Sequence, residues 1–474
     1  MFRKIFYSFA IIILLLFQFK SNAQVIEQDS LALVAFYNST GGPNWDNNSN
    51  WLTGPVSIWY GITVEGDRVT ELKFYSDNNL NGFISEEIGN LNELVKLIIS
   101  NNPNLTGVLP ETIGQLIILY GLGIGNCSLT GTIPNTIGNC SCLEFLNLPQ
   151  NNLTGSIPPE IGNLDSLIFL DLHDNQLTGS IPPVLGNLDN LLELRLNKNN
   201  LTGKLPVNLG NILDNWYPMQ YVFFDVSENQ LIDSIPFSWA NIEMFNVELD
   251  LSSNYFTDIP PWNSNWILNY LNIASNKMTF EDIEPHFVGY SSFVYAPQQF
   301  MCNEVDTLLT LGSNYRIYSG TAGEYTYYQW SHNYEAIQYG SEYDTLVLEN
   351  ISYADTGIYY CYATNSLATG LTLIRQPVHI TIDTSVNVLQ IPGEINISIT
   401  PNPSNGIFNI CLPKNQTVSS ICVYNLGGMK VYKQKTIISG NRKLQIDLSH
   451  LSPGQYIIKL KLKNKIQTGR IIIF

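Results

Sequence analysis

The stretch Leu143-x-x-Leu146-x-Leu148-x-x-Asn151-x-Leu153-Thr154-Gly155-Ser156-Ile157-Pro158 decides the fold of this chain. It returns 24 residues later as residues 167–182, and its leucine, asparagine, glycine and proline positions return again over residues 191–206. A fixed period of this size indicates a solenoid, because one such coil cannot bury its apolar edge alone. Neighbouring coils must therefore stack and share one continuous core.

The spacing inside one repeat predicts its conformation. Leu146-x-Leu148 indicates a short strand whose alternate side chains point inward. Asn151 follows the strand and can satisfy backbone groups that the bend leaves unpaired, so stacked repeats are expected to build an asparagine ladder. Gly155 and Pro158 then turn the chain onto the convex side.

The recurring segment Leu-Thr-Gly-x-Ile-Pro-x-x-Ile/Leu-Gly-Asn resembles the plant-type subclass of leucine-rich repeats. In the same register we count nine repeats within residues 69–292, with degenerate outer copies, as is typical of terminal repeats. Cys127 occupies one asparagine slot of the ladder. The ladder is predicted to end at Asn276, and residues 294–297 are predicted to be a linker.

The fold class follows from these repeats and from the segments after them. We predict a multidomain, mainly β chain. Its first part is a leucine-rich-repeat solenoid with a parallel sheet and an irregular or 3-10 convex side, and two small β-sandwiches follow.

The net charge of −17 on the 474-residue chain is unevenly distributed. Residues 24–390 hold 38 acidic and 9 basic side chains, whereas residues 391–474 hold 2 acidic and 11 basic ones. The basic tail is therefore expected to be a separate module. The acidic body repels phosphate backbones, which argues against nucleic acid as a partner.

The N-terminus predicts export. A basic pair precedes the apolar run 5–19, and Ser21 and Ala23 are small residues at the positions that a signal peptidase reads. Residues 1–23 are therefore predicted to be a secretory signal that is cut before Gln24. An uncleaved anchor is the alternative, but the apolar run is shorter than the roughly 20 residues that span a bilayer. No membrane span is expected after cleavage.

Residues 24–68 are expected to cap the first repeat. Residues 31–37 have helical periodicity. Tryptophans follow, at Trp45, Trp51 and Trp59. The segment resembles the N-terminal cap of plant-type leucine-rich repeats, which shields the open edge of the core. Ser57 and Val64 stand where that cap usually has cysteines, so its tryptophans must hold it.

The seven cysteines form no recognisable framework. Cys140-x-Cys142 is too tight for a zinc site. Cys140 stands where other repeats have leucine, so it is predicted to be a small buried hydrophobe. Cys411 and Cys422 could face each other across a hairpin, and whether they form a disulfide stays open, because spacing alone does not fix connectivity.

Residues 298–384 change to short strands that alternate with turns, which predicts an all-β domain. Trp330 and the motif around Tyr359 and Cys361 resemble an immunoglobulin-like domain, with Tyr359 as its tyrosine corner. Residues 317–318 occupy the place of the partner cysteine. We therefore expect no core disulfide, and we expect Trp330 to pack over a free Cys361.

After a linker at 385–395, residues 396–474 resemble the type A C-terminal sorting domain that the type IX secretion system of Bacteroidetes reads. The residues that carry this resemblance are Pro401, Asn402, Pro403, Gly406, Gly427, Gly454 and Tyr456. The resemblance implies a small β-sandwich, passage across the outer membrane with the type IX machinery, and removal of the tail. The mature form is then left on the cell surface or released.

Signatures of enzymes are missing from the sequence. It contains no Gly-x-Ser-x-Gly elbow, no His-Glu-x-x-His helix and no Gly-x-x-x-x-Gly-Lys loop. We therefore predict a protein that is not an enzyme and that needs no cofactor or metal. Gly121-x-Gly123-x-Gly125 imitates part of a dinucleotide loop, but the repeat register places these glycines outward, as a bare patch of concave surface.

The concave face is where a ligand is expected to bind, through the outward residues that flank the strand leucines. Three phenylalanines form a broken aromatic stripe beside polar groups, which suits a sugar ring or a peptide. The alternative is that aromatics at this position are ordinary filler. The candidate residues are Phe145, Phe169, Asp171, His173, Arg195, Phe223, Asp225 and Tyr270.

Calcium coordination is a further alternative for three outward aspartates. Asp171, Asp225 and Asp250 recur in one column, and carboxylates are the ligands that calcium prefers. Aspartate between two strand leucines is also ordinary consensus for such repeats. We therefore interpret these aspartates as structural.

Together these features predict an exported recognition or adhesion protein that binds an extracellular protein or glycan on its concave face. A passive structural spacer in a surface layer or biofilm is the first alternative. A hydrolase that acts on a polysaccharide is the second, and it requires paired carboxylates in a cleft.

Overall fold

The computed structural model describes the body of the chain and most of its tail. The described residues are 25–213, 221–241, 245–261, 267–287, 292–383, 398–400, 404–411, 417–425, 428–439, 443–462 and 466–473. The expected signal peptide and the expected linker at 385–395 lie outside the described residues.

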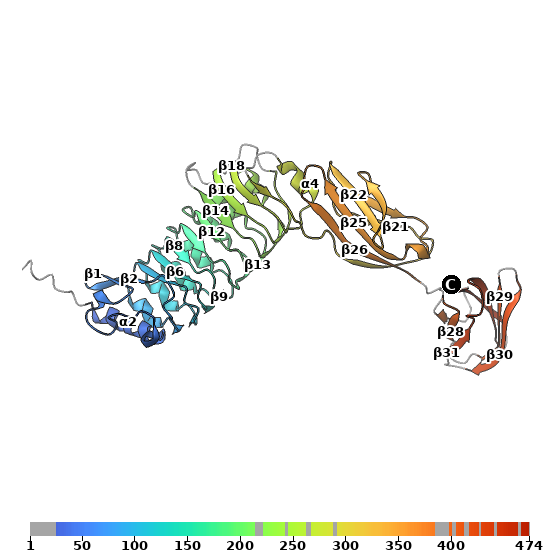
Figure 1. Ribbon diagram of the computed structural model, residues 1–474, viewed down its shortest axis with the longest axis horizontal. Helices are drawn as coiled ribbons and strands as arrows, with labels where there is room; N and C mark the ends of the chain where they lie inside the picture. The colour runs from blue at the N-terminus through green and yellow to red at the C-terminus, as the bar shows by residue number, and fades with distance from the viewer. Residues whose placement is uncertain are drawn as a thin grey trace, which may run out of the picture.

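A curved stack of strands forms the first part of the molecule (Figure 1). Its main sheet has eleven strands, and after the antiparallel pair β1–β2 every later pair is parallel. In sheet order the strands are β1 (Ile62–Glu65), β2 (Arg68–Phe74), β4 (Lys96–Ser100), β6 (Gly121–Gly125), β8 (Phe145–Asn147), β10 (Phe169–Asp171), β12 (Glu193–Arg195), β14 (Val222–Asp225), β16 (Phe245–Asp250), β18 (Ile267–Asn272) and β19 (Phe293–Val294). The solenoid predicted from the period is confirmed.

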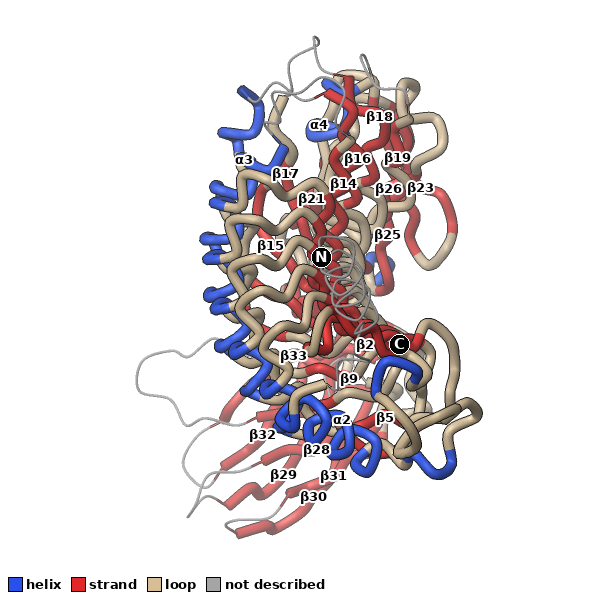
Figure 2. Tube along the Cα trace, turned by 90° about the vertical axis from the view of Figure 1, so that its left-hand side faces the viewer, coloured by secondary structure: helices blue, strands red, loops and turns tan. Residues whose placement is uncertain are grey.

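Short helices lie along the edge of the solenoid opposite the main sheet, as Figure 2 shows. They are η3 (Glu86–Asn90), η4 (Glu111–Gln115), η5 (Asn135–Asn139), η6 (Pro159–Asn163), η7 (Pro183–Asn187), η8 (Val207–Leu209), α3 (Gly210–Leu213) and η9 (Phe237–Asn241). In η6 and η7 a proline opens the turn, where its missing N–H costs no hydrogen bond. The 3-10 convex side was predicted correctly.

Shorter parallel strands join neighbouring coils between the main sheet and these helices. They are β3 (Gly82–Phe83), β5 (Leu105–Thr106), β7 (Thr130–Gly131), β9 (Asn152–Leu153), β11 (Thr178–Gly179), β13 (Asn200–Gly203), β15 (Gln230–Ser234) and β17 (Tyr255–Asp258). Each coil is therefore bonded to its neighbours along two sides, which leaves its interior free for leucine packing.

The inward leucines form one continuous core. Leu146 of β8 pairs with Leu170 of β10, and Leu170 pairs with Leu194 of β12. All three side chains are fully buried. Cys140 is equally buried among them, and burial raises the pKa of its thiol to about 12, so it behaves as the small hydrophobe that was predicted.

A ladder of buried asparagines joins consecutive coils. The Asn175 side chain accepts a hydrogen bond from the Leu153 N–H of the preceding coil at 3.1 Å and donates to the Leu148 carbonyl at 2.9 Å. The same pattern recurs along the solenoid at Asn151, Asn199, Asn229, Asn254 and Asn276. In the slot of Cys127, the thiol contacts the Gly125 carbonyl of its own coil and the backbone of Asn102 in the coil before it, in place of these amide bonds.

The ladder continues past Asn276, so the predicted linker at 294–297 is wrong. β19 pairs with β18, and Gln298 takes the next ladder position. Its side-chain oxygen accepts from the N–H groups of Asn276 and Met278, and its side-chain nitrogen donates to the Ile273 and Tyr295 carbonyls. A glutamine, one methylene longer than asparagine, therefore performs the ladder role at the last coil.

Aromatic side chains close the N-terminal end of the solenoid. The cap consists of α2 (Glu27–Ser39), η1 (Gly42–Asn44) and η2 (Val56–Ile58). Trp45 is 4.9 Å from Trp51 and 5.1 Å from Phe74, the inward residue at the end of β2. The buried Asp29 also pairs with Arg68 and accepts from the Val69 N–H. Tryptophan packing thus covers the open edge.

Two sheets form the domain that follows the solenoid. One sheet has the order β20-β26-β25-β22-β23, and the other pairs β21 with β24. Their bounds are β20 (Val305–Leu309), β21 (Tyr315–Tyr318), β22 (Thr326–His332), β23 (Glu335–Gly340), β24 (Thr345–Leu348), β25 (Gly357–Asn365) and β26 (Thr372–Ile382), with η11 (Tyr353–Asp355) before β25. Between this domain and the last ladder position of the solenoid lie only residues 299–304.

The core of this second domain has the features expected around Trp330. Trp330 pairs with Cys361 across neighbouring strands, and both side chains are fully buried. Cys361 is a free thiol, and Ile317 is buried in the other sheet. The Tyr359 hydroxyl donates to the Asp355 carbonyl at 3.0 Å, which ties the start of β25 to the turn before it.

The tail has a hydrophobic core of its own. Its strands are β27 (Ser398–Thr400), β28 (Ile407–Cys411), β29 (Thr417–Asn425), β30 (Lys430–Ser439), β31 (Lys443–Asp447), β32 (Gly454–Leu462) and β33 (Ile466–Ile473). They form the sheets β27-β28-β31 and β30-β29-β32-β33. Cys411 and Cys422 thus lie in different sheets rather than in one hairpin, and Cys422 is a free thiol.

Within the described ranges, no helix has the length and apolar character that a bilayer crossing requires.

Candidate functional site

Outward residues of the main sheet form straight rows across the coils. Phe145 pairs with Phe169, Phe169 with Glu193, and Glu193 with Phe223. The next row runs from Asn147 through Asp171, Arg195 and Asp225 to Asp250. Both rows match the columns predicted from the sequence, because the leucines on either side of each outward residue point into the core and fix the alternation.

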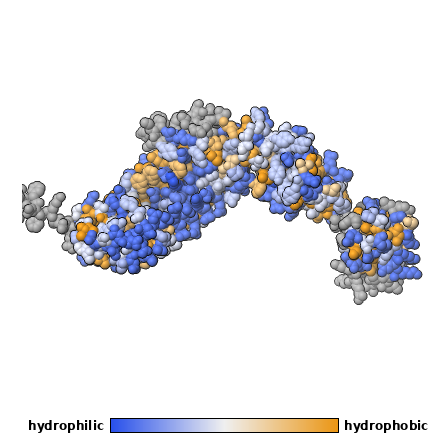
Figure 3. Space-filling view, viewed as in Figure 1, coloured by the Kyte–Doolittle hydropathy of each residue, from blue (hydrophilic) through white to orange (hydrophobic). Residues whose placement is uncertain are grey.

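An aromatic ridge stands on the first part of this face. Phe145 and Phe169 are stacked, with ring centroids 4.9 Å apart and planes 9° from parallel. Tyr120, just before β6, extends the ridge at 5.1 Å from Phe145. The rings are half-buried, so part of each ring remains exposed to solvent. Figure 3 shows an apolar patch on this side of the solenoid.

A strand without side chains lies beside the ridge. Gly121 of β6 pairs with Lys96 on one side and Phe145 on the other. A side chain at Gly121 would meet only Lys96, at 3.9 Å, whereas at Gly123 it would come within 3.1 Å of Ile98. Gly121 is nevertheless buried, whereas Gly123 and Gly125 are half-buried, so the expected bare patch is limited to the second half of β6.

The outward aspartates hold their own strands. Asp171, Asp225 and Asp250 each accept the N–H of the residue two positions further on, at 3.0, 2.9 and 2.9 Å. This hydrogen bond between the aspartate side chain and the backbone closes a tight turn, which ends the strand and fixes the bend that follows. The recurring aspartate is therefore explained by chain geometry, which favours the structural interpretation over calcium coordination.

His173 and Asp171 form a polar pair next to the ridge. The His173 Nδ1 lies 2.7 Å from the Asp171 carboxylate, and this hydrogen bond raises the pKa of His173 above its ordinary value. Because His173 is partly exposed, its ring is available to a ligand that approaches the ridge.

Arg195 and Phe223 form a second pair, two coils further along from Phe169. The Arg195 guanidinium lies 4.4 Å from the centre of the Phe223 ring, and its Nε donates to Glu193 at 2.5 Å. Asp225 lies beside Asp250 on the next strand, and burial followed by this neighbouring charge raises the pKa of Asp225. This half of the face is polar and mainly acidic.

The candidate residues therefore fall into groups. Phe145, Phe169, Asp171 and His173 lie on adjacent strands, and Arg195, Phe223 and Asp225 form a second cluster. Tyr270 on β18 lies two strands beyond Phe223, next to Glu248, and does not join either cluster. Glu193 separates the two clusters and breaks the aromatic stripe.

Two tyrosines of this face were missed by the sequence analysis. Tyr120 extends the ridge, and Tyr221 bonds to Glu248, with burial and that bond raising the pKa of Tyr221 to about 12. Tyr120 is out of phase with the outward residues of β6, and Tyr221 occupies the slot that Leu191 fills in the coil before it, so the repeat assigns neither to the face. The two-residue spacing of Tyr221 from Phe223 is a signal that could have found it, whereas no sequence signal singles out Tyr120.

No group of three or more His, Cys, Asp or Glu side chains in the described ranges is arranged to bind a metal ion.

The residues that carry the sorting resemblance are described in part. Gly406 has φ +102°, and a side chain there would meet the Ser449 backbone at 2.4 Å, so only glycine fits. Gly454 begins β32, and the Tyr456 hydroxyl donates to the Ser452 carbonyl at 2.6 Å. Pro401, Asn402, Pro403 and Gly427 lie outside the described residues.

Comparison with family models assigns two regions of the chain. Residues 68–285 match the model described as a leucine-rich repeat region, and residues 398–474 match the secretion system C-terminal sorting domain. The solenoid therefore consists of leucine-rich repeats, and the tail is a sorting domain of a secretion system.

Comparison with individual proteins gives partial matches. The leucine-rich repeat protein FLOR 1 of Arabidopsis thaliana is 34% identical over 100 residues, which are 20% of this chain and 29% of that protein. A plant ice-binding protein has a TM-score of 0.49 and 26% identity, covering 60% of this chain and 90% of its own. The plant peptide hormone receptor RGFR1 in complex with RGF2 has a TM-score of 0.43 and 35% identity, covering 48% and 36%. The chain thus spans less than a third of its curated relative.

Proposed function

We propose that this chain is an exported recognition protein whose concave sheet binds an extracellular protein or glycan. The observation that carries the proposal is the ridge of Tyr120, Phe145 and Phe169, which remains partly exposed although it is stacked. Exposed aromatic surface beside charged groups is a frequent composition of binding sites. The half-buried Gly123 and Gly125 of β6 have no side chains that would keep a partner away from the backbone beside the ridge.

The proposal assigns different roles to the two halves of the face. The ridge supplies apolar contact area, while Asp171 with His173 and Glu193 with Arg195 supply charged hydrogen-bonding groups at its edge. An apolar centre with a polar rim is typical of recognition surfaces. The rim then sets orientation and specificity, and the ridge supplies most of the affinity.

Export belongs to the same proposal. The sorting tail and the signal-like N-terminus are consistent with passage through the type IX system to the outer surface or the medium. The domain at 298–384, with its Tyr359 corner and its Trp330 over Cys361, is proposed to be immunoglobulin-like and to act as a spacer or a second binding module.

Array binding of the full chain tests the concave-face proposal. The chain is screened against glycans and extracellular proteins, and each hit is measured again with Phe169→Ala. Phe237→Ala is the matched control, because Phe237 is an exposed phenylalanine of η9 on the convex side. We expect Phe169→Ala to weaken binding by about tenfold or more and the control to bind as wild type. Equal binding by both variants would show that the ligand does not bind at the ridge.

One observation favours the rival role of a passive spacer. The outward aspartates of β10, β14 and β16 are already occupied by N–H groups of their own coils, so they need no ligand. A spacer predicts no saturable partner in either array. A single saturable partner that is sensitive to Phe169→Ala excludes that role.

A further inference from the structure

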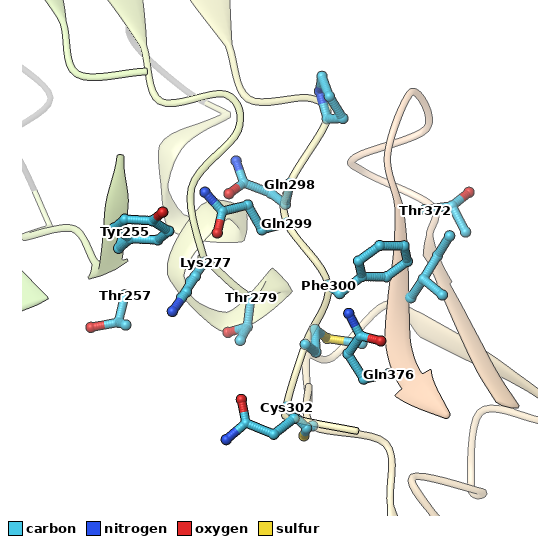
Figure 4. Close-up of a pocket in the computed structure, with 15 residues that line it drawn as sticks. Tyr255, Thr257, Lys277, Thr279, Gln298, Gln299, Phe300, Cys302, Thr372 and Gln376 are labelled. Atoms are coloured by element: carbon cyan, nitrogen blue, oxygen red, sulfur yellow. The ribbon is translucent and has the colours of Figure 1, made fainter. Parts of the chain in front are cut away.

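A cleft of about 800 Å³ lies where the solenoid meets the second domain. Figure 4 shows Tyr255, Thr257 and Lys277 on the solenoid side, while Phe300 and Thr372 lie across the connecting segment. Clefts between domains are common places for ligands. The cleft is distinct from the concave face, since β17 and the loop after Asn276 belong to another side of the coil.

The cleft has fixed walls because several bonds hold the two domains together. The Gln299 side chain donates to the carbonyls of Asn254 and Ser275 in the solenoid. Two residues later, the Met301 N–H donates to the Ile374 carbonyl of β26 in the second domain. Asn365 also donates to Glu284, in η10 (Glu284–His286) at the end of the solenoid. A binding site in this position is therefore largely pre-formed.

The charge of the cleft is opposite to that of the chain. The chain has 40 acidic and 23 basic side chains, yet no residue that lines the cleft is acidic. Lys277 is its one charged residue, and it makes no ion pair with any described residue. Its ammonium lies 4.7 Å from the centre of the Tyr255 ring, which positions the charge at the cleft wall.

The remaining lining offers hydrogen bonds and one apolar platform. The side chains of Thr257, Asn303, Thr372 and Gln376 have no hydrogen-bond partner among the described residues, so they can serve a ligand. Phe300 is 56% exposed although it lies at a domain junction. Figure 4 places its ring on the side of Thr372, away from Lys277.

We propose that this cleft binds an acidic saccharide oligomer. Phe300 provides the apolar ring surface on which sugars pack, the hydroxyl and amide side chains pair with sugar hydroxyls, and Lys277 receives one carboxylate or sulfate. Phe300 and Lys277 lie on opposite sides of the segment 298–300, so a ligand that uses both must be longer than one sugar unit. An acidic peptide fits less well, because aspartate and glutamate side chains offer no ring face to Phe300 and no hydroxyl groups to the threonine and amide side chains of the lining.

Binding of defined oligomers to the full chain tests this proposal. The probes are hexamers of alginate and of polygalacturonate, with uncharged cellohexaose and poly-L-glutamate as comparisons. Lys277→Gln and Phe300→Ala are each expected to weaken binding of an acidic hexamer about tenfold. Lys198→Gln is the matched control, because it removes the same charge from an exposed lysine outside the cleft. Phe169→Ala should leave this binding unchanged, which separates it from the concave-face site.

Three results would overturn the proposal. The first is that neither acidic hexamer binds, and the second is that both bind equally well to wild type and to Lys277→Gln. The third is that poly-L-glutamate binds more tightly than the hexamers, which would assign the cleft to an acidic peptide.

Thiol labelling then locates the bound oligomer. Cys302 lines the cleft and is an exposed free thiol, whereas Cys142 is an exposed free thiol outside it. Mass spectrometry of the labelled full chain should show that an acidic hexamer slows labelling of Cys302 and leaves Cys142 unchanged. Equal slowing at both thiols, or at neither, contradicts binding in the cleft.

Discussion

The two ends of the solenoid are closed by different interactions. At the N-terminal end, Trp45, Trp51 and Phe74 cover the open core edge with stacked rings. At the C-terminal end, Gln298 extends the ladder by one more set of hydrogen bonds and passes the chain directly into the next domain. The open edge of a solenoid core can therefore be covered by apolar side chains or by a further coil that continues the hydrogen bonds of the ladder.

The comparison predicts the largest effect at the aromatic end. Trp45→Ala removes a side chain that is 5% exposed and leaves a cavity among its neighbours, which should cost about 3–5 kcal/mol in free energy of unfolding. Hydrogen exchange should show lost protection in β2 and unchanged protection in β32 of the tail. Leu52→Ala is the control, because Leu52 lies in the same cap but is 50% exposed. Equal loss in both variants would contradict a cap held by its buried rings.

Acid should weaken the C-terminal end. Burial lowers the pKa of His286, in η10, from 6.5 to about 4, so between these values the unfolded chain binds more protons than the folded one. Above about pH 6.5, His286 is neutral in both states and does not lower the free energy of unfolding. As the pH drops to about 4, the free energy of unfolding falls by up to roughly 3 kcal/mol. Exchange rates at β18, measured from pH 7 to 4, check this.

The comparison variant for the acid prediction is His286→Gln, which has no titrating ring. Its exchange at β18 should change less with pH than that of wild type. Parallel profiles for the two proteins would show that another group is responsible.

A smaller effect is expected at the ladder extension. Gln298→Ala leaves the N–H groups of Asn276 and Met278 without their acceptor, which should cost about 2–3 kcal/mol. Denaturant unfolding followed by exchange at β18 and β19 measures this cost. Gln176→Ala is the control, since Gln176 makes one exposed 3.3 Å bond to Asn152. An unchanged midpoint for Gln298→Ala would mean that Gln298 does not close the solenoid.

The smallest effect belongs to the surface of the cap. Glu93 lies 3.6 Å from Arg68 and is 49% exposed, so Glu93→Gln should change stability by less than about 0.5 kcal/mol. Arg68 keeps its buried partner Asp29 in that variant. A loss above 1 kcal/mol in urea unfolding would show that exposed charges, rather than rings, hold this end.

The sequence predicted the parts of the fold that repeat. Leucines on both sides of an outward residue allow only one alternation, so the sequence alone predicts the rows through Phe145, Phe169 and Phe223. Asn151, Asn175 and Asn199 stand at a constant step of 24 residues for the same reason. Where each coil resembles the one before it, local pattern and tertiary packing agree.

The features that the sequence did not predict either occur only once in the chain or depend on a contact between two domains. Gln298 is not an asparagine, so the pattern did not assign it to the ladder, although it follows Asn276 by the same 22 residues that separate Asn276 from Asn254. The cleft unites Lys277 of the solenoid with Phe300 and Gln376, whose proximity depends on how the second domain is held. Spacing along the chain contains no information on such a contact.

The cysteine at position 127 affects how the solenoid resists a pulling force along its length. In its slot the side chain gives no amide bridge to the coil before it, and the Leu105 N–H turns to the Asn102 carbonyl instead. Exposed side chains bridge this boundary instead: Asn126 donates to Asn101, and Ser128 donates to the Pro103 carbonyl, each at 2.7 Å. Under tension between the two ends of the solenoid, part of the bonding between these coils therefore lies at the surface, where water competes for it, whereas the amide bridges at Asn151 and Asn175 are buried.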